Sequence, residues 1–454
     1  MSKFHRFAAV LPALFFALIT IHPSAYSVIP VVMALVGLVF LPKTFRLLAD
    51  KEVRLLSFGL LVYWLIYLFS YFYHGERLSS IDLPSRSLLA AFSLLVMVRY
   101  PPKLSWVMYG IACGSVITGL IAFYQAYVLH MRAFLGFGYM VIQIGGICAW
   151  LGMLSAVGYI YFARQKMGKS AGFALLGTTM GLAACFLSGA RGAWVFTPVV
   201  AMGVLWIGYL SLNKKLTLAL LAAWSLALVA CLPQIESRFY LAVNELQSYD
   251  GAKNTLDATG LEVPLDSNQP EDAEVHQVPV LQSQAVFDES EIPDDIPIEV
   301  SSSGIRIELW KSALYTALDY PLFGYGHERL DEEKQRQIDR GLVDPIVLTG
   351  PRAHNQYLEE LQTKGLLGLL GLTLMFAMPF FYYVKNMLPR AIRRDQPELF
   401  FASMLGTVHV LMVAGFCLTQ HYLNHHSGIL MFAFGTAIFS AQVITLSSSR
   451  RLHV

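Results

Sequence analysis

The sequence predicts an all-α polytopic membrane protein, with about twelve transmembrane helices and one large helical loop domain outside the bilayer. Its 454 residues are 56% hydrophobic and only 14% charged, a balance far more apolar than that of soluble proteins. Apolar runs of roughly 17 to 25 residues, the length that crosses a hydrocarbon core about 30 Å thick, recur along the chain. One long polar segment interrupts them after the ninth run.

These runs divide the chain into three parts, namely nine spans in residues 1–232, a loop domain in 233–365 and three spans in 366–454. The start of the chain also has the basic flank and apolar run of a signal peptide, but the same pattern recurs at later spans. The predicted spans lie near residues 7–22, 25–41, 55–73, 82–98, 104–130, 137–163, 171–187, 193–211, 216–232, 366–385, 398–418 and 427–446.

The positions of the basic residues predict the orientation. Nineteen of the 33 Lys and Arg residues lie at the termini or in alternate short loops, which the positive-inside rule assigns to the cytoplasm. The opposite short loops carry only Arg77, Arg86, Arg132 and Arg191, so we expect that face to be the outer one. The net charge of +2 is too small to indicate a nucleic-acid partner.

The loop domain contains two kinds of sequence. Residues 245–300 hold fourteen Asp or Glu against the single Lys253, a composition typical of a solvated insert. Asp294 and Asp295 could be read as a metal-binding pair, but the sequence shows no other metal motif and its five cysteines lie in or beside apolar runs. We therefore predict neither a metal nor a cofactor. After the insert, one helix is predicted to end near Tyr320, and a second to start near Pro351 and reach Gly365.

Four arginines from separate loops of the predicted outer face could bind an anion. Arg191 stands between glycines in "LSGARGAWV", where it could face a ligand or simply extend to the interface. Arg306 lies one helical turn before Trp310, so the two could stack, or Arg306 could pair with a nearby acid. Arg86 and Arg132 are the other two. Guanidinium groups without a metal motif suit a diphosphate, and a diphosphate at a membrane surface suggests a lipid-linked sugar.

A histidine could supply the base for such a site. Arg352 and His354 are predicted to lie in the first turn of the helix that starts near Pro351, where the helix dipole keeps an imidazole neutral and able to accept a proton. A cap or packing role for His354 is the alternative. The three histidines of "TQHYLNHHSG" (His421, His425 and His426) are predicted to be exposed at the interface.

Three motifs resemble the O-antigen ligase and polymerase family: "SGARGAW" at 188–194, "RIELWKSAL" with "YPLFGYG" at 306–326, and "AHNQYLEELQTKGLLGLL" at 353–370. The resemblance implies a GT-C-like glycosyltransferase with Arg191 and Arg306 binding the diphosphate and His354 as general base. It also implies substrate contacts by Arg86, Arg132, Arg352, Trp310 and Asn355. Gln143 stands near a place where the family commonly has asparagine.

The implied reaction moves an O-antigen chain from undecaprenyl diphosphate to the lipid A-core of lipopolysaccharide, without a metal and with inversion. The implied partners are these two glycolipids and the membrane lipids. The site would face the periplasm from the bacterial inner membrane, with both termini cytoplasmic. An O-antigen polymerase and a protein O-oligosaccharyltransferase are the alternatives within the class, and a secondary transporter is the alternative outside it.

Overall fold

The protein is a bundle of helices, seen here in a computed structural model that describes residues 3–240, 243 and 302–451. The described part of the chain contains helices and no strand. The acidic segment 245–300, which contains Asp294 and Asp295, was predicted to be a solvated insert and lies outside the described residues.

Among the described residues, ten helices, some of them counted with a short extension, are long and apolar enough to cross a membrane. They are α2 (Ala25–Thr44), α3 (Lys51–His74), α4 (Ser85–Arg99), α5 (Leu104–Phe123), α6 (Val141–Arg164), α7 (Gly168–Ser188), α8 (Arg191–Ser211), α13 (Gln356–Met387), α15 (Pro397–Phe416) and α16 (His426–Arg451). The remaining α-helices are α1 (Lys3–Leu18), α9 (Lys214–Ala230), α11 (Ser302–Asp319), α12 (Leu330–Asp339) and α14 (Arg390–Asp395). Short 3-10 or π turns are η1 (Phe45–Ala49), η2 (Leu78–Ile81), η3 (Tyr124–Val128), η4 (Pro345–Thr349) and η5 (Tyr422–Asn424).

The all-helical membrane class is confirmed, but the count of twelve spans is not. The predicted first span is only the short apolar helix Phe7–Leu18. The predicted ninth span, α9, is followed after a 62° bend by the helix Leu232–Tyr240, and counting that pair as one span gives eleven.

The centre of the bundle is formed by α6, α15 and α16. In the most apolar stretch of α6, 94% of the residues are buried, and in the corresponding stretches of α15 and α16 the buried share of the residues is 89%. Helices that are apolar on all sides are expected in such a position. The short helix α1 joins the bundle by close backbone contact, since a Cβ on Gly110 or Gly114 of α5 would clash with the carbonyl oxygen of Ala13 or Phe16 in α1.

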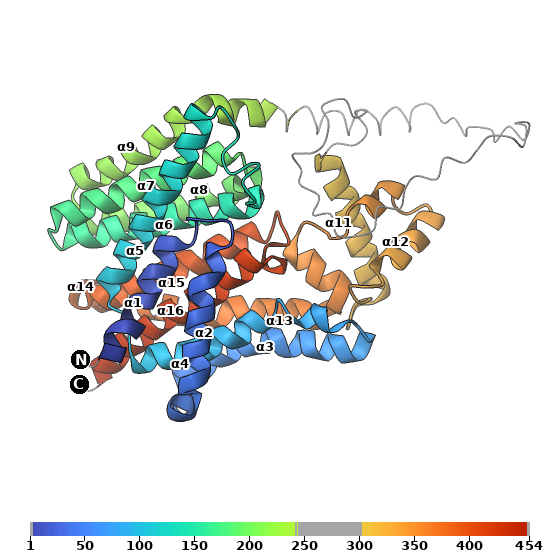
Figure 1. Cartoon of the computed structure of the whole chain (residues 1–454), viewed down its shortest axis with the longest axis horizontal. Helices are drawn as coiled ribbons and strands as arrows, with labels where there is room; N and C mark the ends of the chain where they lie inside the picture. Colours follow the sequence, from blue (N-terminus) through green and yellow to red (C-terminus); the bar gives the residue numbers. More distant parts are fainter. Residues whose placement is uncertain (1–2, 241–242, 244–301, 452–454) are drawn as a thin grey trace, which may run out of the picture.

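The two non-membrane helices lie at one end of the bundle. Figure 1 shows α11 and α12 at the end opposite to the start of α1 and the end of α16. They attach to the bundle through the loop after α3, where the backbone N–H of His327 donates to Glu76 (2.7 Å) and that of Arg77 donates to Glu328 (2.8 Å).

A break in α13 at Gly365 fixes the loop that follows α11. Gly365 has φ 63° and ψ −155°, which interrupts the helix and exposes backbone groups on both sides of the break. The loop after α11 uses these groups: Tyr325 N–H donates to Gln362 O (3.0 Å), and Leu366 N–H donates to Pro321 O (2.8 Å). The motif "YPLFGYG" is therefore a backbone partner of α13.

Gly365→Ala is expected to destabilise the protein strongly. A Cβ at this position would clash with the backbone carbon of Leu322, and the positive φ adds roughly 1–2 kcal/mol for any L side chain. Gly341→Ala is the matched control, because Gly341 has φ 66° with nothing within 4 Å of its added Cβ. Thermal unfolding in detergent should show a clearly larger loss for Gly365→Ala than for Gly341→Ala, and equal losses would contradict the close backbone contact.

Candidate active site

The segment 351–355 is a loop, so the prediction that it forms the first turn of a helix is wrong. The helix α13 begins at Gln356, because the side chain of Asn355 caps it by accepting from the backbone N–H groups of Tyr357 (3.0 Å) and Leu358 (3.2 Å). His354 precedes this cap with φ 48°, in the left-handed region. Arg352 and His354 therefore do not lie among the free N–H groups of a first helical turn.

His354 is held by the loop between α15 and α16. Its Nδ1 lies 2.9 Å from the side-chain oxygen of Gln420, so Nδ1 donates and the lone pair of the ring is on Nε2. The ring of His354 meets that of His421 edge to face at a centroid distance of 5.0 Å. The ring of His425 follows at 4.7 Å from that of His421.

The prediction of three exposed histidines is wrong for two of them. His421 is buried and His425 is half-buried, while His426 is exposed. Burial, His425 and the neighbouring Arg352, His354 and Arg306 hold the pKa of His421 well below its ordinary value. Burial, together with Arg352 and His354, lowers the pKa of His425 to about 3. Both imidazoles are therefore uncharged at neutral pH.

Asn355 helps to fix the same loop. Besides capping α13, it donates from Nδ2 to Leu418 O (3.0 Å). Gln356 adds a donation from its backbone N–H to Cys417 O (2.8 Å) and accepts from Leu423 N–H (2.9 Å). These contacts give Asn355 a positioning role, and its predicted contact with substrate stays a prediction.

Arg191 begins α8, directly after the turn that ends α7. Gly189 adopts φ 65° in this turn. A Cβ on Gly192 would lie 2.6 Å from Oγ1 of Thr419, the residue before Gln420. The start of α8 is thus packed on the loop that holds His354, which brings the "SGARGAW" motif and the "AHNQ" motif to one place.

Arg132 and an arginine that the sequence analysis missed, Arg238, converge on Gly189. The Nε of Arg132 donates to Ser188 O at the end of α7 (2.7 Å). A Cβ on Gly189 would lie 3.1 Å from Nε of Arg238 and 3.2 Å from Nε of Arg132. Both arginines line a cavity of about 310 Å³ that also includes His130 and Gln234. In the sequence, only the position of Arg238 just before the acidic insert could have indicated that this arginine belongs to the site.

Arg306 and Trp310 of α11 reach the loop before α13. Trp310 donates from its indole nitrogen to Ala353 O (2.8 Å), which fixes the residue before His354. Arg306 is close enough to contribute to the lowered pKa of His421. Arg86, by contrast, forms an ion pair with Asp82 (2.6 Å) at the start of α4. The predicted stacking of Arg306 on Trp310 stays a prediction.

A buried network of polar residues on α13 was also missed by the sequence analysis. Glu359 accepts from Arg352 (3.2 Å) and from Ala353 N–H (3.0 Å), so it holds both residues before His354. Glu360 pairs with Lys364 (3.2 Å) and accepts from Tyr67 of α3 (2.7 Å). The segment "QYLEELQTK" gives no sign of this burial, because the partners in α3 are almost 300 positions away.

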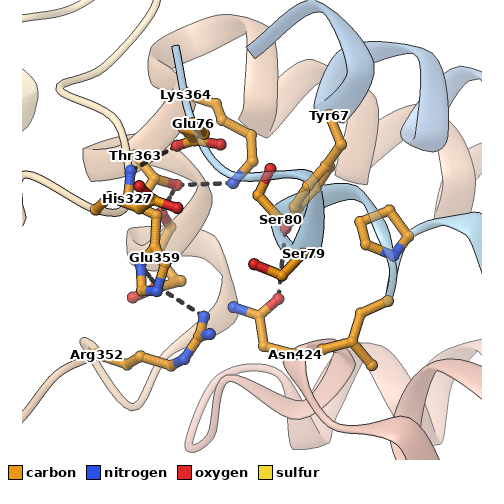
Figure 2. A pocket seen from close by; sticks show the side chains of 13 residues that line it. Tyr67, Glu76, Ser79, Ser80, His327, Arg352, Glu359, Thr363, Lys364 and Asn424 are labelled. Carbon is orange, nitrogen blue, oxygen red and sulfur yellow. Dashed lines mark hydrogen bonds and ion pairs between the residues drawn. The ribbon is translucent and has the colours of Figure 1, made fainter. Parts of the chain in front are cut away.

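Figure 2 shows the cavity beside this network, which we call the polar cavity. Its volume is about 260 Å³. It lies between the loop after α3, the loop after α11 and the start of α13, and its lining residues are Tyr67, Glu76, Ser79, Ser80, Leu83, Pro84, His327, Glu328, Arg352, Glu359, Thr363, Lys364 and Asn424.

Two comparisons with known proteins bear on this site. Residues 176–373 match the family model described as O-antigen ligase. The matched segment contains Arg191, Arg306 and His354, whereas Arg86 and Arg132 precede it. The chain is also similar to an uncharacterised protein of Haemophilus influenzae, with 28% identity over 435 residues that make up 93% of this chain and 95% of the relative.

Proposed function

We propose that this chain, a member of the O-antigen ligase family, transfers an O-antigen polysaccharide from undecaprenyl diphosphate to the lipid A-core of lipopolysaccharide. The observation that carries the proposal is the position of His354. It lies in the matched segment, in a loop that Trp310 and Gln420 fix and on which the start of α8 at Arg191 packs. The reaction takes place on the periplasmic face of the bacterial inner membrane, with both termini in the cytoplasm.

The chemistry follows from the tautomer of His354. With Nδ1 donating to Gln420, Nε2 takes the proton of the acceptor hydroxyl as that oxygen attacks the anomeric carbon. The bond from the anomeric carbon to the phosphate oxygen breaks, and its electron pair leaves with the diphosphate. One direct displacement inverts the anomeric configuration and requires no covalent enzyme intermediate.

Arginines stabilise the departing diphosphate. Arg191 and Arg306 bind it, and Arg86, Arg132 and Arg352 assist. Planar guanidinium groups hold phosphate oxygens at two points each, so they supply the positive charge that a metal ion would otherwise provide. Arg352 also pairs with Glu359, at 3.2 Å.

Transfer by the purified protein tests the proposal. The full chain is incubated with lipid A-core, a lipid-linked oligosaccharide and EDTA, and the products are separated on a gel. We expect lipid A-core carrying the oligosaccharide. Growth of the lipid-linked chain alone would identify a polymerase, and transfer only to a pilin-like protein would identify a protein O-oligosaccharyltransferase. Either result would overturn the ligase assignment. Complete loss of transfer in EDTA would overturn the metal-independent mechanism.

Gln420 provides a prediction about the base. Gln420→Leu removes one hydrogen bond to His354, so kcat should fall by about 2- to 10-fold. In Gln420→Glu a carboxylate beside Nδ1 favours the imidazolium and raises the pKa of His354. The base must be neutral to act, so the acidic limb of the kcat/KM profile should move to higher pH. Gln335→Leu on the exposed face of α12 is the control, and an unmoved profile in Gln420→Glu would contradict the tautomer assignment.

A further inference from the structure

The polar cavity does not have the composition of a diphosphate site. Three carboxylates line it, from Glu76, Glu328 and Glu359. Its two cationic side chains are each in an ion pair, Arg352 with Glu359 and Lys364 with Glu360, both at 3.2 Å. A doubly charged anion would therefore meet repulsion that the paired cations do not offset.

Apart from the apolar Leu83 and Pro84, the rest of the wall consists of uncharged donors and acceptors. Hydroxyl groups come from Tyr67, Ser79, Ser80 and Thr363, and an amide comes from Asn424. Burial and the neighbouring Arg352 lower the pKa of His327 to about 4, so its imidazole is neutral at physiological pH. A ligand with many hydroxyl groups can donate to the carboxylates and accept from these groups in several directions at once.

Two buried atoms at this cavity have no hydrogen-bond partner among the described residues. They are Oγ of Ser80 and Nδ1 of His327. The ion-pair contact of His327 joins its Nδ1 to Oε1 of Glu359 over 3.8 Å, and this distance is too long for a hydrogen bond. Buried polar atoms nearly always have partners, so two such atoms on residues that line one cavity indicate a polar ligand or water there.

The polar cavity is directly connected to the loop of His354. Arg352 lines the cavity and stands two residues before the histidine. Glu359, also in the wall, accepts from the N–H of Ala353. A ring bound in the cavity thus lies beside the loop that presents the proposed base, on the side of that loop where carboxylates prevail.

We propose that the polar cavity binds the acceptor saccharide, the sugar whose hydroxyl attacks the donor. This inference rests on the proposed function. The donor also carries sugars, which share the same hydroxyl chemistry. The acceptor is the occupant that the charges favour, because a donor sugar enters with the diphosphate attached, next to three carboxylates.

Ser80→Phe tests the inference by filling the cavity. The variant should raise the KM for lipid A-core by about tenfold or more and leave the KM for the lipid-linked donor unchanged. Ser80→Ala, which removes only the hydroxyl, should raise the KM for lipid A-core by about 2- to 10-fold. Leu78→Phe is the matched control, because Leu78 belongs to the same short helix η2, is 68% exposed and does not line the cavity.

The outcomes separate this inference from the proposed function. An unchanged KM for lipid A-core in a folded Ser80→Phe protein would overturn the inference. A raised KM for the donor alone would also overturn the inference, because it would assign the cavity to the donor sugar. If the unmodified protein transfers nothing, the proposed function fails. Binding of delipidated core oligosaccharide by the full chain then decides the inference, because weaker binding to Ser80→Phe supports a saccharide site and equal binding overturns it.

Discussion

His354→Asn is expected to lower the rate of transfer by about 10²- to 10⁴-fold, the usual contribution of a general base. An asparagine amide can donate to Gln420 in place of Nδ1 but cannot take a proton from the acceptor. It also tolerates the φ of 48° at this position, where alanine would be strained. The asparagine variant therefore removes the base and preserves the loop.

The measurement is kcat for transfer to lipid A-core by purified protein, with thermal unfolding as the check on folding. His22→Asn is the control, because His22 is an exposed histidine remote in sequence from the motifs. Near-normal transfer by a folded His354→Asn protein would remove His354 from the mechanism. The similarity of residues 176–373 to the O-antigen ligase family model would stand in that case, since it does not depend on the role of His354.

Arg191→Ala should lower kcat by about 10²- to 10³-fold, the loss typical of removing one group that stabilises charge in the transition state. Arg191→Lys keeps the positive charge but loses the planar fork, so its activity should lie between those of the alanine variant and the unmodified protein. Since the start of α8 packs on the loop of His354, the loss should appear in kcat even at saturating donor.

The control for this series is Arg77→Ala. Arg77 lies in the loop after α3, and its side chain is 86% exposed. Its backbone N–H donates to Glu328, and the substitution preserves this hydrogen bond, while it removes an exposed ion pair of 3.7 Å between the Arg77 side chain and Glu328. Equal activity of Arg191→Ala and Arg77→Ala would contradict the role of Arg191.

The sequence predicts the membrane helices well because their burial in lipid depends on length and apolarity alone. Nine of the ten helices that the structure supports as spans begin within about four residues of their predicted positions. The exception is α13, which begins ten residues before the predicted span because its polar first turns are buried against α3. Polar residues in a buried turn do not differ in sequence from those on a solvated face.

The motifs predict Arg191, Arg306 and His354 as site residues, and these roles stay predictions. The structure brings the "AHNQ" and "SGARGAW" segments onto one loop. The cap by Asn355, the burial of His421 and the contact of Arg238 with Gly189 could not be predicted. Each depends on tertiary partners distant in the sequence, and no local pattern encodes them.

The central claim is that guanidinium groups bind the donor diphosphate beside His354. A structure of the full chain in lipid nanodiscs with undecaprenyl diphosphate tests it most directly. The account predicts the diphosphate between Arg191 and Arg306, at the end of the bundle that carries α11 and α12. A diphosphate bound at the opposite end, or with both arginines turned away from it, would contradict the account.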